Sequence, residues 1–147
     1  MLSEKTNALT PEIYTELRRK VGFQEYPMED VAMALEKTLF SVVIHDDDKP
    51  VGIGRIVGDD RIVFFIKDVV VDPDYQKKTI GYTIMQTLLK YIEGKACKNA
   101  YVGLMSTPHN EDFYKKLGFI QRPTTHFGHG MVKFVNTTCE MDNLKRG

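Results

Sequence analysis

The stretch that decides the fold is "VVVDPDYQKKTIGYTIMQTLL", residues 69–89. It begins with β-branched residues typical of a strand, which Pro73 ends. A polar segment with Lys77, Lys78 and Gly81 follows, and apolar residues then recur at the spacing of an amphipathic helix. A helix N-terminus presents unpaired N–H groups and the positive end of the helix dipole. The loop is therefore either a plain connector or a phosphate-binding turn.

The composition is that of a globular domain. The chain has 147 residues, of which 42% are hydrophobic and 27% charged, and its formal net charge is +0. This balance predicts a folded core and offers no basic surplus for nucleic acid or an anionic membrane. Two cysteines without CxxC spacing, and no apolar run of about 20 residues, favour a cytoplasmic protein without disulfides or membrane spans. We expect one domain over residues 1–147, with a frayed tail over residues 138–147.

Periodicity predicts the elements on either side of the opening stretch. Thr10 and Pro11 are the residue types of an N-cap and a first helical position. Helices are expected over residues 10–23, 26–38, 82–95 and 110–119, with Gly94 as the C-cap of the third and Gly118 closing the fourth. Strands are expected over residues 39–46, 51–58, 61–71, 99–105, 119–123 and 131–135. The first three strands are joined by tight acidic turns, which predicts an antiparallel meander.

Three other patterns indicate no functional site. "LRRK" at residues 17–20 is expected on the solvent-exposed face of the first helix. "GIGRIVG" at residues 52–58 lies inside a predicted strand and opens no helix, so its glycines indicate a bulge or a close backbone approach rather than a dinucleotide site. His126 and His129 have no further ligand cluster beside them, and no metal site is expected.

Two constellations together resemble the GCN5-related N-acetyltransferase (GNAT) superfamily. They are "VVVDPDYQKKTIG" at residues 69–81 and "FYKKLGF" at residues 113–119. The positions that match the family pattern are Val69, Val71, Pro73, Tyr75, Gln76, Gly81, Tyr114, Lys116, Gly118 and Phe119. The resemblance implies an α/β (α+β) fold in which a mixed, mostly antiparallel sheet is flanked by helices.

One residue departs from the family pattern. Thr79 stands where the resemblance implies a glycine in the middle of the loop. Because a β-branched residue tolerates positive φ poorly, we expect an ordinary backbone at Thr79 or a differently shaped loop. The threonine hydroxyl would either help to hold a phosphate or crowd it.

The resemblance implies acetyl-CoA as the cosubstrate. Main-chain groups near Val69, Val70 and Val71 would pair with the pantetheine arm, and Asn110 resembles a residue that contacts the same arm. N–H groups of the loop and helix start would hold the pyrophosphate. The implied binding residues of that second segment are Gln76, Lys77, Lys78, Thr79, Ile80, Gly81 and Tyr82. Asn110 is equally suited to be a helix N-cap.

By the same resemblance, an amine attacks the thioester directly and Tyr114 protonates the departing thiolate. An unperturbed phenol has a pKa of about 10, close enough to the ~8.5 of a thiol for this transfer. A main-chain N–H near Val70 or Val71 would stabilise the oxyanion. Asp68 is a candidate base, although a structural acceptor at a strand end explains it equally well. The alternatives for the base are ordered water, Glu111, His45, His126 and His129.

The acceptor is expected between residues 23–27 and residues 125–130, opposite the cofactor. Neither segment holds an acidic cluster, which favours a small-molecule amine over a basic protein tail. Homodimerisation is common in the family and stays open here. Two alternatives remain for the function: a non-catalytic acyl-CoA sensor or partner module, and an enzyme that uses a longer acyl donor.

Overall fold

The structure is a computed structural model that describes residues 1–76 and 79–135. The chain divides into two compact units, one formed by Met1–Leu104 and one that begins at Met105. The predicted tail over residues 138–147 lies outside the described residues. Among the described helices, none has the length and apolar character needed to span a bilayer.

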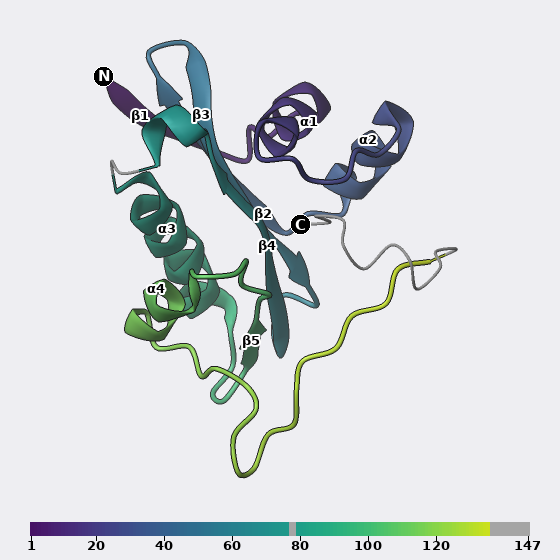
Figure 1. Cartoon of the computed structure of the whole chain (residues 1–147), viewed down its shortest axis with the longest axis vertical. Helices are drawn as coiled ribbons and strands as arrows, with labels where there is room; N and C mark the ends of the chain where they lie inside the picture. Colours follow the sequence, from purple (N-terminus) through teal and green to yellow (C-terminus); the bar gives the residue numbers. More distant parts are fainter. Residues whose placement is uncertain (77–78, 136–147) are drawn as a thin grey trace. The chain divides into compact units, whose positions relative to one another are not determined.

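A five-stranded sheet forms the centre of the first unit, in the order β1-β2-β3-β4-β5 (Figure 1). The strands are β1 (Leu2–Thr6), β2 (Phe40–Asp46), β3 (Lys49–Gly58), β4 (Val63–Val71) and β5 (Tyr101–Gly103). β1 to β4 pair antiparallel, and β5 lies parallel to β4. The predicted meander and the predicted mixed, mostly antiparallel sheet are both confirmed.

Sequence patterning missed the first strand. All residues of β1, "LSEKT", are exposed, so no apolar alternation marks it. β1 exists because its main chain pairs with β2, from Leu2 opposite Asp46 to Thr6 opposite Val42. An edge strand of this kind is stabilised by its ladder rather than by side-chain burial.

Helices cover both faces of the sheet (Figure 1). α1 (Pro11–Lys20) and α2 (Met28–Glu36) pack on one face, where Val43, Ile53 and Val70 of three strands meet the apolar side of α1. As predicted, the side chain of Thr10 caps α1, accepting a bond of 3.2 Å from the N–H of Ile13. α3 (Ile80–Lys95) packs on the opposite face.

Two glycines of β3 allow α3 to lie close to the sheet. A Cβ at Gly52 would lie 2.8 Å from Cγ2 of Ile80, and one at Gly54 would lie 2.6 Å from Cγ2 of Ile84. Real side chains do not come this close, so both positions require glycine. The expected close backbone approach is confirmed. Gly94 is not the C-cap of α3, because the helix continues through Lys95 and ends at Ala96.

The second unit contains the short helix α4 (Glu111–Lys116), which Gly118 closes with a φ of +97° as predicted. The strands expected over residues 119–123 and 131–135 are wrong, because neither segment is assigned as a strand. Their apolar residues are largely exposed, with Met131 at 88% and Val132 at 69%. β-branched composition alone does not form a strand without a partner.

Candidate functional site

β4 has an open edge along its second half. β5 pairs only with residues 63–65 of β4, whereas β3 pairs with β4 along most of its length. Alternate main-chain groups of a strand point to each side. From Ile66 to Val71, therefore, β4 presents N–H and C=O groups to a side on which no described strand pairs with it. The predicted segment Val69, Val70 and Val71 lies on this edge, where an extended ligand could add as a further strand.

A β-bulge interrupts β4 where the open edge begins. Ile53 faces Val70 and Arg55 faces Lys67, so that two residues of β4 oppose one of β3. Asp68 lies in this bulge with a φ of 58°. A bulge bends its strand and increases the local twist, which is suited to separating β4 from β5. The sequence analysis described Asp68 as an acceptor at a strand end, but the structure places it inside β4.

Asp68 is the centre of a buried ion cluster. Its side chain is fully buried, and one carboxylate oxygen accepts a short hydrogen bond from Nη1 of Arg18. The other oxygen accepts from Nε of Arg55 at 2.9 Å, and Nζ of Lys67 lies 3.7 Å from the first. Both oxygens are therefore engaged by guanidinium groups. This geometry supports the structural role of Asp68, since a base must lie within hydrogen-bond reach of the proton it removes and the fully buried carboxylate faces guanidinium groups instead.

Aromatic rings enclose Arg18. Its guanidinium lies 5.1 Å from the ring centroid of Tyr14, 5.3 Å from that of Phe23 and 5.6 Å from that of Tyr26. Nη2 of Arg18 also donates to the main-chain oxygen of Gln24 at 3.0 Å. These contacts attach the link between α1 and α2, where the acceptor was expected, to the centre of β4.

The expectation that "LRRK" forms a solvent-exposed face is wrong for Arg18, which is 3% exposed. Its neighbour Arg19 fits the expectation, with a side chain that is 60% exposed. The sequence spacing contains a signal that could have found Arg18. Tyr14 lies one turn before Arg18 and Leu17 directly precedes it, so the three residues have the 14, 17, 18 spacing of one helix face, and both neighbours are buried.

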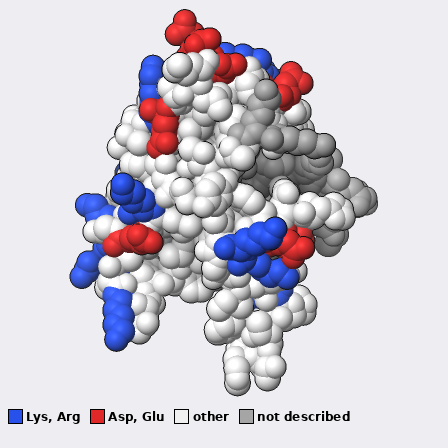
Figure 2. All heavy atoms as spheres, turned by 90° about the vertical axis from the view of Figure 1, so that its left-hand side faces the viewer, with Lys and Arg blue, Asp and Glu red and all other residues white. Residues whose placement is uncertain are grey.

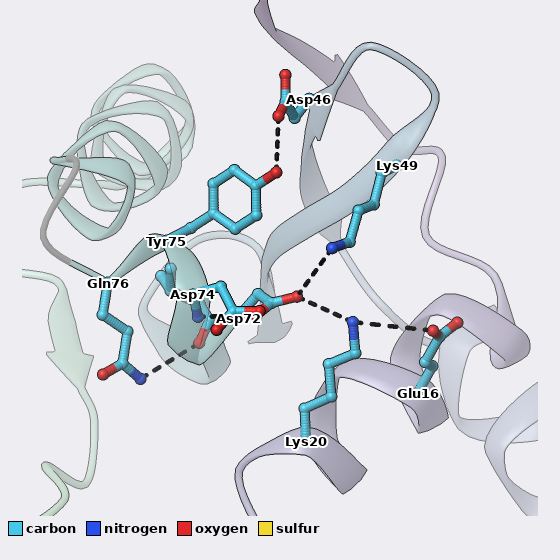
Figure 3. A network of polar contacts seen from close by, with 9 residues as sticks. Glu16, Lys20, Asp46, Lys49, Asp72, Asp74, Tyr75 and Gln76 are labelled. Carbon is cyan, nitrogen blue, oxygen red and sulfur yellow. Dashed lines mark hydrogen bonds and ion pairs between the residues drawn. The ribbon is translucent and has the colours of Figure 1, made fainter.

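A second carboxylate, Asp72, holds the loop that leaves β4 (Figure 3). Its side chain is 3% exposed and accepts a hydrogen bond of 2.9 Å from Nζ of Lys20, with Nζ of Lys49 at 3.9 Å. It also accepts from the N–H of Asp74 at 3.0 Å, capping the 3₁₀ turn Pro73–Tyr75. Burial alone would raise the pKa of Asp72, but the hydrogen bonds from Lys20 and Asp74 lower it below the ordinary value.

Tyr75 and Gln76 continue the same network (Figure 3). The hydroxyl of Tyr75 donates to Asp46 at 2.7 Å, and Nζ of Lys49 lies 5.4 Å from the tyrosine ring centroid. The side chain of Gln76 donates to the carbonyl of Val71 at 3.3 Å. At the matched motif positions, Tyr75 therefore holds the turn against the β2–β3 hairpin, and Gln76 holds it to the end of β4.

Thr79 adopts the left-handed conformation that a glycine would take, with φ 61° and ψ 12°. The expectation of an ordinary backbone at this position is wrong. Thr79 adopts this left-handed conformation although it costs a non-glycine residue roughly 1–2 kcal/mol. The carbonyl of Thr79 accepts from the N–H of Thr83 at 3.1 Å, which starts the hydrogen bonding of α3.

The start of α3 divides the remaining predicted loop residues by role. Ile80 is 2% exposed and belongs to the core, so only its main chain can serve a ligand. Gly81 lies in the first turn of the helix. Tyr82 is exposed, and its hydroxyl accepts a hydrogen bond from Gln86 at 2.7 Å. Lys77 and Lys78 lie outside the described residues.

Tyr114 and Asn110 lie in the second unit. Tyr114 is half-buried between two aromatic rings, at 5.0 Å from Phe113 and 6.1 Å from Phe119, both edge to face. Burial raises the pKa of Tyr114 above its ordinary value of 10.0. Asn110 occupies the N-cap position of α4 but makes no side-chain cap bond, since its amide donates to Oγ1 of Thr107 at 2.6 Å.

The other candidate bases lie elsewhere in the chain. His45 is buried in β2, where its Nδ1 lacks a hydrogen-bond partner among the described residues, and burial lowers its pKa. β3 lies between β2 and β4, so His45 is not beside the open edge. Glu111 begins α4, and His126 and His129 are exposed in the second unit.

The main chain of the first unit fits the arm and the phosphates of a coenzyme A thioester. The open edge of β4 offers hydrogen-bonding groups to an extended amide-containing arm. The edge leads through the turn held by Asp72 to the N-terminus of α3, where unpaired N–H groups suit an anion. On the face shown in Figure 2, basic and acidic side chains lie side by side, which gives no continuous basic surface there for a polyanion.

Comparison with known structures supports this arrangement. A probable acetyltransferase from methicillin-resistant Staphylococcus aureus is 32% identical, with a TM-score of 0.82, covering 91% of this chain and 100% of that one. A GNAT-family acetyltransferase from Streptococcus pneumoniae is 28% identical, with a TM-score of 0.76, covering 93% of this chain and 100% of that one.

Curated proteins of similar sequence are also named as N-acetyltransferases. GCN5-related N-acetyltransferase 1, chloroplastic, from Arabidopsis thaliana is 30% identical over 84% of this chain, and serotonin N-acetyltransferase 2, chloroplastic, from Oryza sativa is 32% identical over 74% of it. The chain spans 62% and 55% of the length of these two relatives. The model of the acetyltransferase (GNAT) family matches residues 6–119, and this chain belongs to that family.

Proposed function

We propose that the protein is an acetyl-CoA-dependent N-acetyltransferase that acts on a small-molecule amine. The observation that carries the proposal is the open edge of β4 from Ile66 to Val71, which leads directly to the N-terminus of α3. One continuous length of main chain thereby offers strand-like pairing followed by an anion site. Acetyl-CoA, which supplies the activated acetyl group, has the matching order of an amide-rich arm followed by phosphates. A cytoplasmic location stays a prediction.

The binding roles follow from this order. Main-chain groups of Val69, Val70 and Val71 pair with the arm, and N–H groups from Thr79 to Tyr82 hold the pyrophosphate. Asp72 supports both, since it holds the turn between them through Lys20 and through the N–H of Asp74. Asp68 keeps the bulge in place rather than removing a proton, because both its oxygens are engaged.

In the reaction, the acceptor nitrogen forms a bond to the acetyl carbon, the carbon–sulfur bond breaks, and Tyr114 donates its proton to the thiolate. The raised pKa of Tyr114 keeps the phenol protonated throughout the neutral range. A main-chain N–H of β4 near Val70 or Val71 stabilises the developing oxyanion. With Asp68 engaged, ordered water is the favoured route for the amine proton.

The test is a screen of amines with acetyl-CoA, followed by release of free thiol, with serotonin included because the rice relative is named for it. Tyr114→Phe should lower kcat about 10²–10⁴-fold, with acetyl-CoA affinity within a factor of about two. The matched control is Tyr101→Phe, which removes the hydroxyl of a tyrosine that is 55% exposed on β5 and should leave kcat near wild type.

The pH profile gives a second readout of the acid. Because the pKa of Tyr114 is raised above 10.0, the wild-type rate should not fall on the alkaline side until the pH exceeds 10. Tyr114→Phe should remove that fall. If acetyl-CoA binds while wild type and Tyr114→Phe are equally inert with every amine, a non-catalytic sensor replaces the enzyme. Tighter binding of succinyl- or malonyl-CoA would overturn acetyl-CoA as the donor.

A further inference from the structure

Among the described residues, the ion cluster around Asp68 contains more basic than acidic side chains. Arg18, Arg55 and Lys67 all lie within ion-pair distance of this one carboxylate. For Arg55 and Lys67, Asp68 is the sole acidic partner among the described residues. Charges in such a poorly hydrated place are costly unless they are paired, so the cluster favours a further anion.

Lys67 is the member of the cluster that a ligand can reach. Its side chain is 34% exposed, against 3% for Arg18 and 12% for Arg55. Its ammonium makes no hydrogen bond to a described residue, since the contact with Asp68 is 3.7 Å long. Burial lowers the pKa of Lys67, Asp68 raises it, and the charges of Arg18 and Arg55 lower it further. A bound anion would stabilise the charged ammonium and so raise the pKa of Lys67 again.

Arg55 reinforces the same place. Its Nε donates to Asp68 at 2.9 Å and its Nη1 donates to Oγ1 of Thr38 at 3.2 Å. Its remaining terminal nitrogen, Nη2, makes no hydrogen bond to a described residue. Arg55 and Lys67 are directly opposed across β3 and β4, so their side chains leave the sheet on the same face.

That face is the one on which an acceptor would approach. α3, whose N-terminus is assigned to the phosphates, packs on the other face of the sheet. Lys67 belongs to the open stretch of β4 and lies beside the bulge at Asp68. Arg18 connects the cluster to the link at residues 23–27, the expected acceptor wall, through Phe23 and Gln24.

We propose that the acceptor amine carries an anionic group, a carboxylate or a phosphate, which binds the ammonium of Lys67 with support from Arg55. The acceptor is then a zwitterionic small molecule. Its anion is anchored on β4, and its amine is directed along the open edge. This inference rests on the proposed N-acetyltransferase function and narrows its substrate class.

Two matched pairs of amines test the inference. L-Phenylalanine against phenethylamine isolates a carboxylate, and phosphoethanolamine against ethanolamine isolates a phosphate. For at least one pair, the anionic member should have a kcat/KM about 10-fold to 100-fold higher, and the pair that responds identifies the anion. Lys67→Met should reduce that ratio about 10-fold, which corresponds to about 1.4 kcal/mol. The control Lys90→Met removes an exposed lysine of α3 and should leave the ratio unchanged.

The outcomes separate the inference from the function beneath it. Turnover of phenethylamine and ethanolamine with no preference for their anion-bearing partners overturns the inference and leaves the N-acetyltransferase in place. An unchanged ratio in Lys67→Met also overturns it. If acetyl-CoA does not bind at all, the proposed function fails. The anion site is then tested by treating the protein with an amine-modifying reagent and measuring the modification of each lysine by mass spectrometry. Inorganic phosphate should slow the modification of Lys67 by a factor at least 5-fold larger than that for Lys90.

Discussion

Asp68 and Asp72 lie close together in the sequence, and each pairs with one basic residue from α1 and one from β3. Asp68 pairs with Arg18 and Arg55, whereas Asp72 pairs with two lysines, Lys20 and Lys49. The two sets of basic partners differ in how deeply their side chains are buried and in whether the donor is a guanidinium or an ammonium group. The arginines are nearly buried, whereas the lysine side chains are 32% and 50% exposed.

The two pairings have different tasks. The cluster at Asp68 holds a bulge in the middle of a strand, where guanidinium groups occupy both carboxylate oxygens and aromatic rings exclude water. The network at Asp72 holds a surface turn, where a lysine and one main-chain N–H suffice. The same residue type is therefore part of the core at one position and a loop anchor at the next.

The largest expected effect comes from breaking the buried cluster. Arg18→Met should lower the free energy of unfolding by about 2–3 kcal/mol, because it removes a charged hydrogen bond from one oxygen of the buried Asp68, while Arg55 stays on the other oxygen. Urea unfolding followed by circular dichroism measures this. The control Arg19→Met changes the adjacent, exposed arginine and should have little effect.

A double-mutant cycle shows whether the loss belongs to the pair. Asp68→Asn keeps the shape of the side chain and tolerates the left-handed φ of 58°. Arg18→Met together with Asp68→Asn should cost at least about 1 kcal/mol less than the sum of the two single changes. Strict additivity would contradict the view that Asp68 depends on Arg18.

A smaller effect is expected at the surface turn. Lys20→Met should lower the free energy of unfolding by about 1 kcal/mol, because Asp72 keeps the N–H of Asp74 and lies near Lys49. For a chain of this size that is a fall in Tm of roughly 2–4 °C. If Lys20→Met costs as much as Arg18→Met, burial does not distinguish the two networks.

Acid titration provides the control for Lys20→Met. The folded-state pKa of Asp72 lies below the ordinary value of 3.8, so its contribution to stability is present above pH 3.8 and is lost as the pH falls through the folded pKa. Removing Lys20 removes part of the cause of that lowered pKa. The stability difference between wild type and Lys20→Met should therefore shrink as the pH falls from 4 toward 2.

The smallest effect is expected at Thr79, which shares the left-handed backbone of Asp68 but makes no side-chain cap bond to α3. Thr79→Gly should raise the free energy of unfolding by up to about 1 kcal/mol, because glycine adopts φ 61° without a steric penalty. Acetyl-CoA affinity, measured by calorimetry, should stay equal or improve. A large loss of affinity would instead show that the hydroxyl holds a phosphate.

Much of the fold follows from local patterns. The cap at Thr10, the meander and the helix after residue 79 were predictable because capping chemistry and periodicity act over a few residues. β1 was not predictable, since its exposed side chains carry no pattern and its stability comes from pairing with β2. The two strands expected after residue 118 failed for the converse reason, as they have composition but no described partner.

The candidate site divides in the same way. By itself, the sequence determined the family and the segment of main chain from Val69 to Tyr82 that would bind a coenzyme. These groups are contiguous in the chain, so their order in the sequence is also their order along the ligand. Only the tertiary structure decided that Arg18 and Arg55 meet Asp68 and its sequence neighbour Lys67, since the two arginines come from α1 and β3. Charge clustering depends on distance in space, and the sequence spacing between the arginines and Asp68 contains no record of that distance.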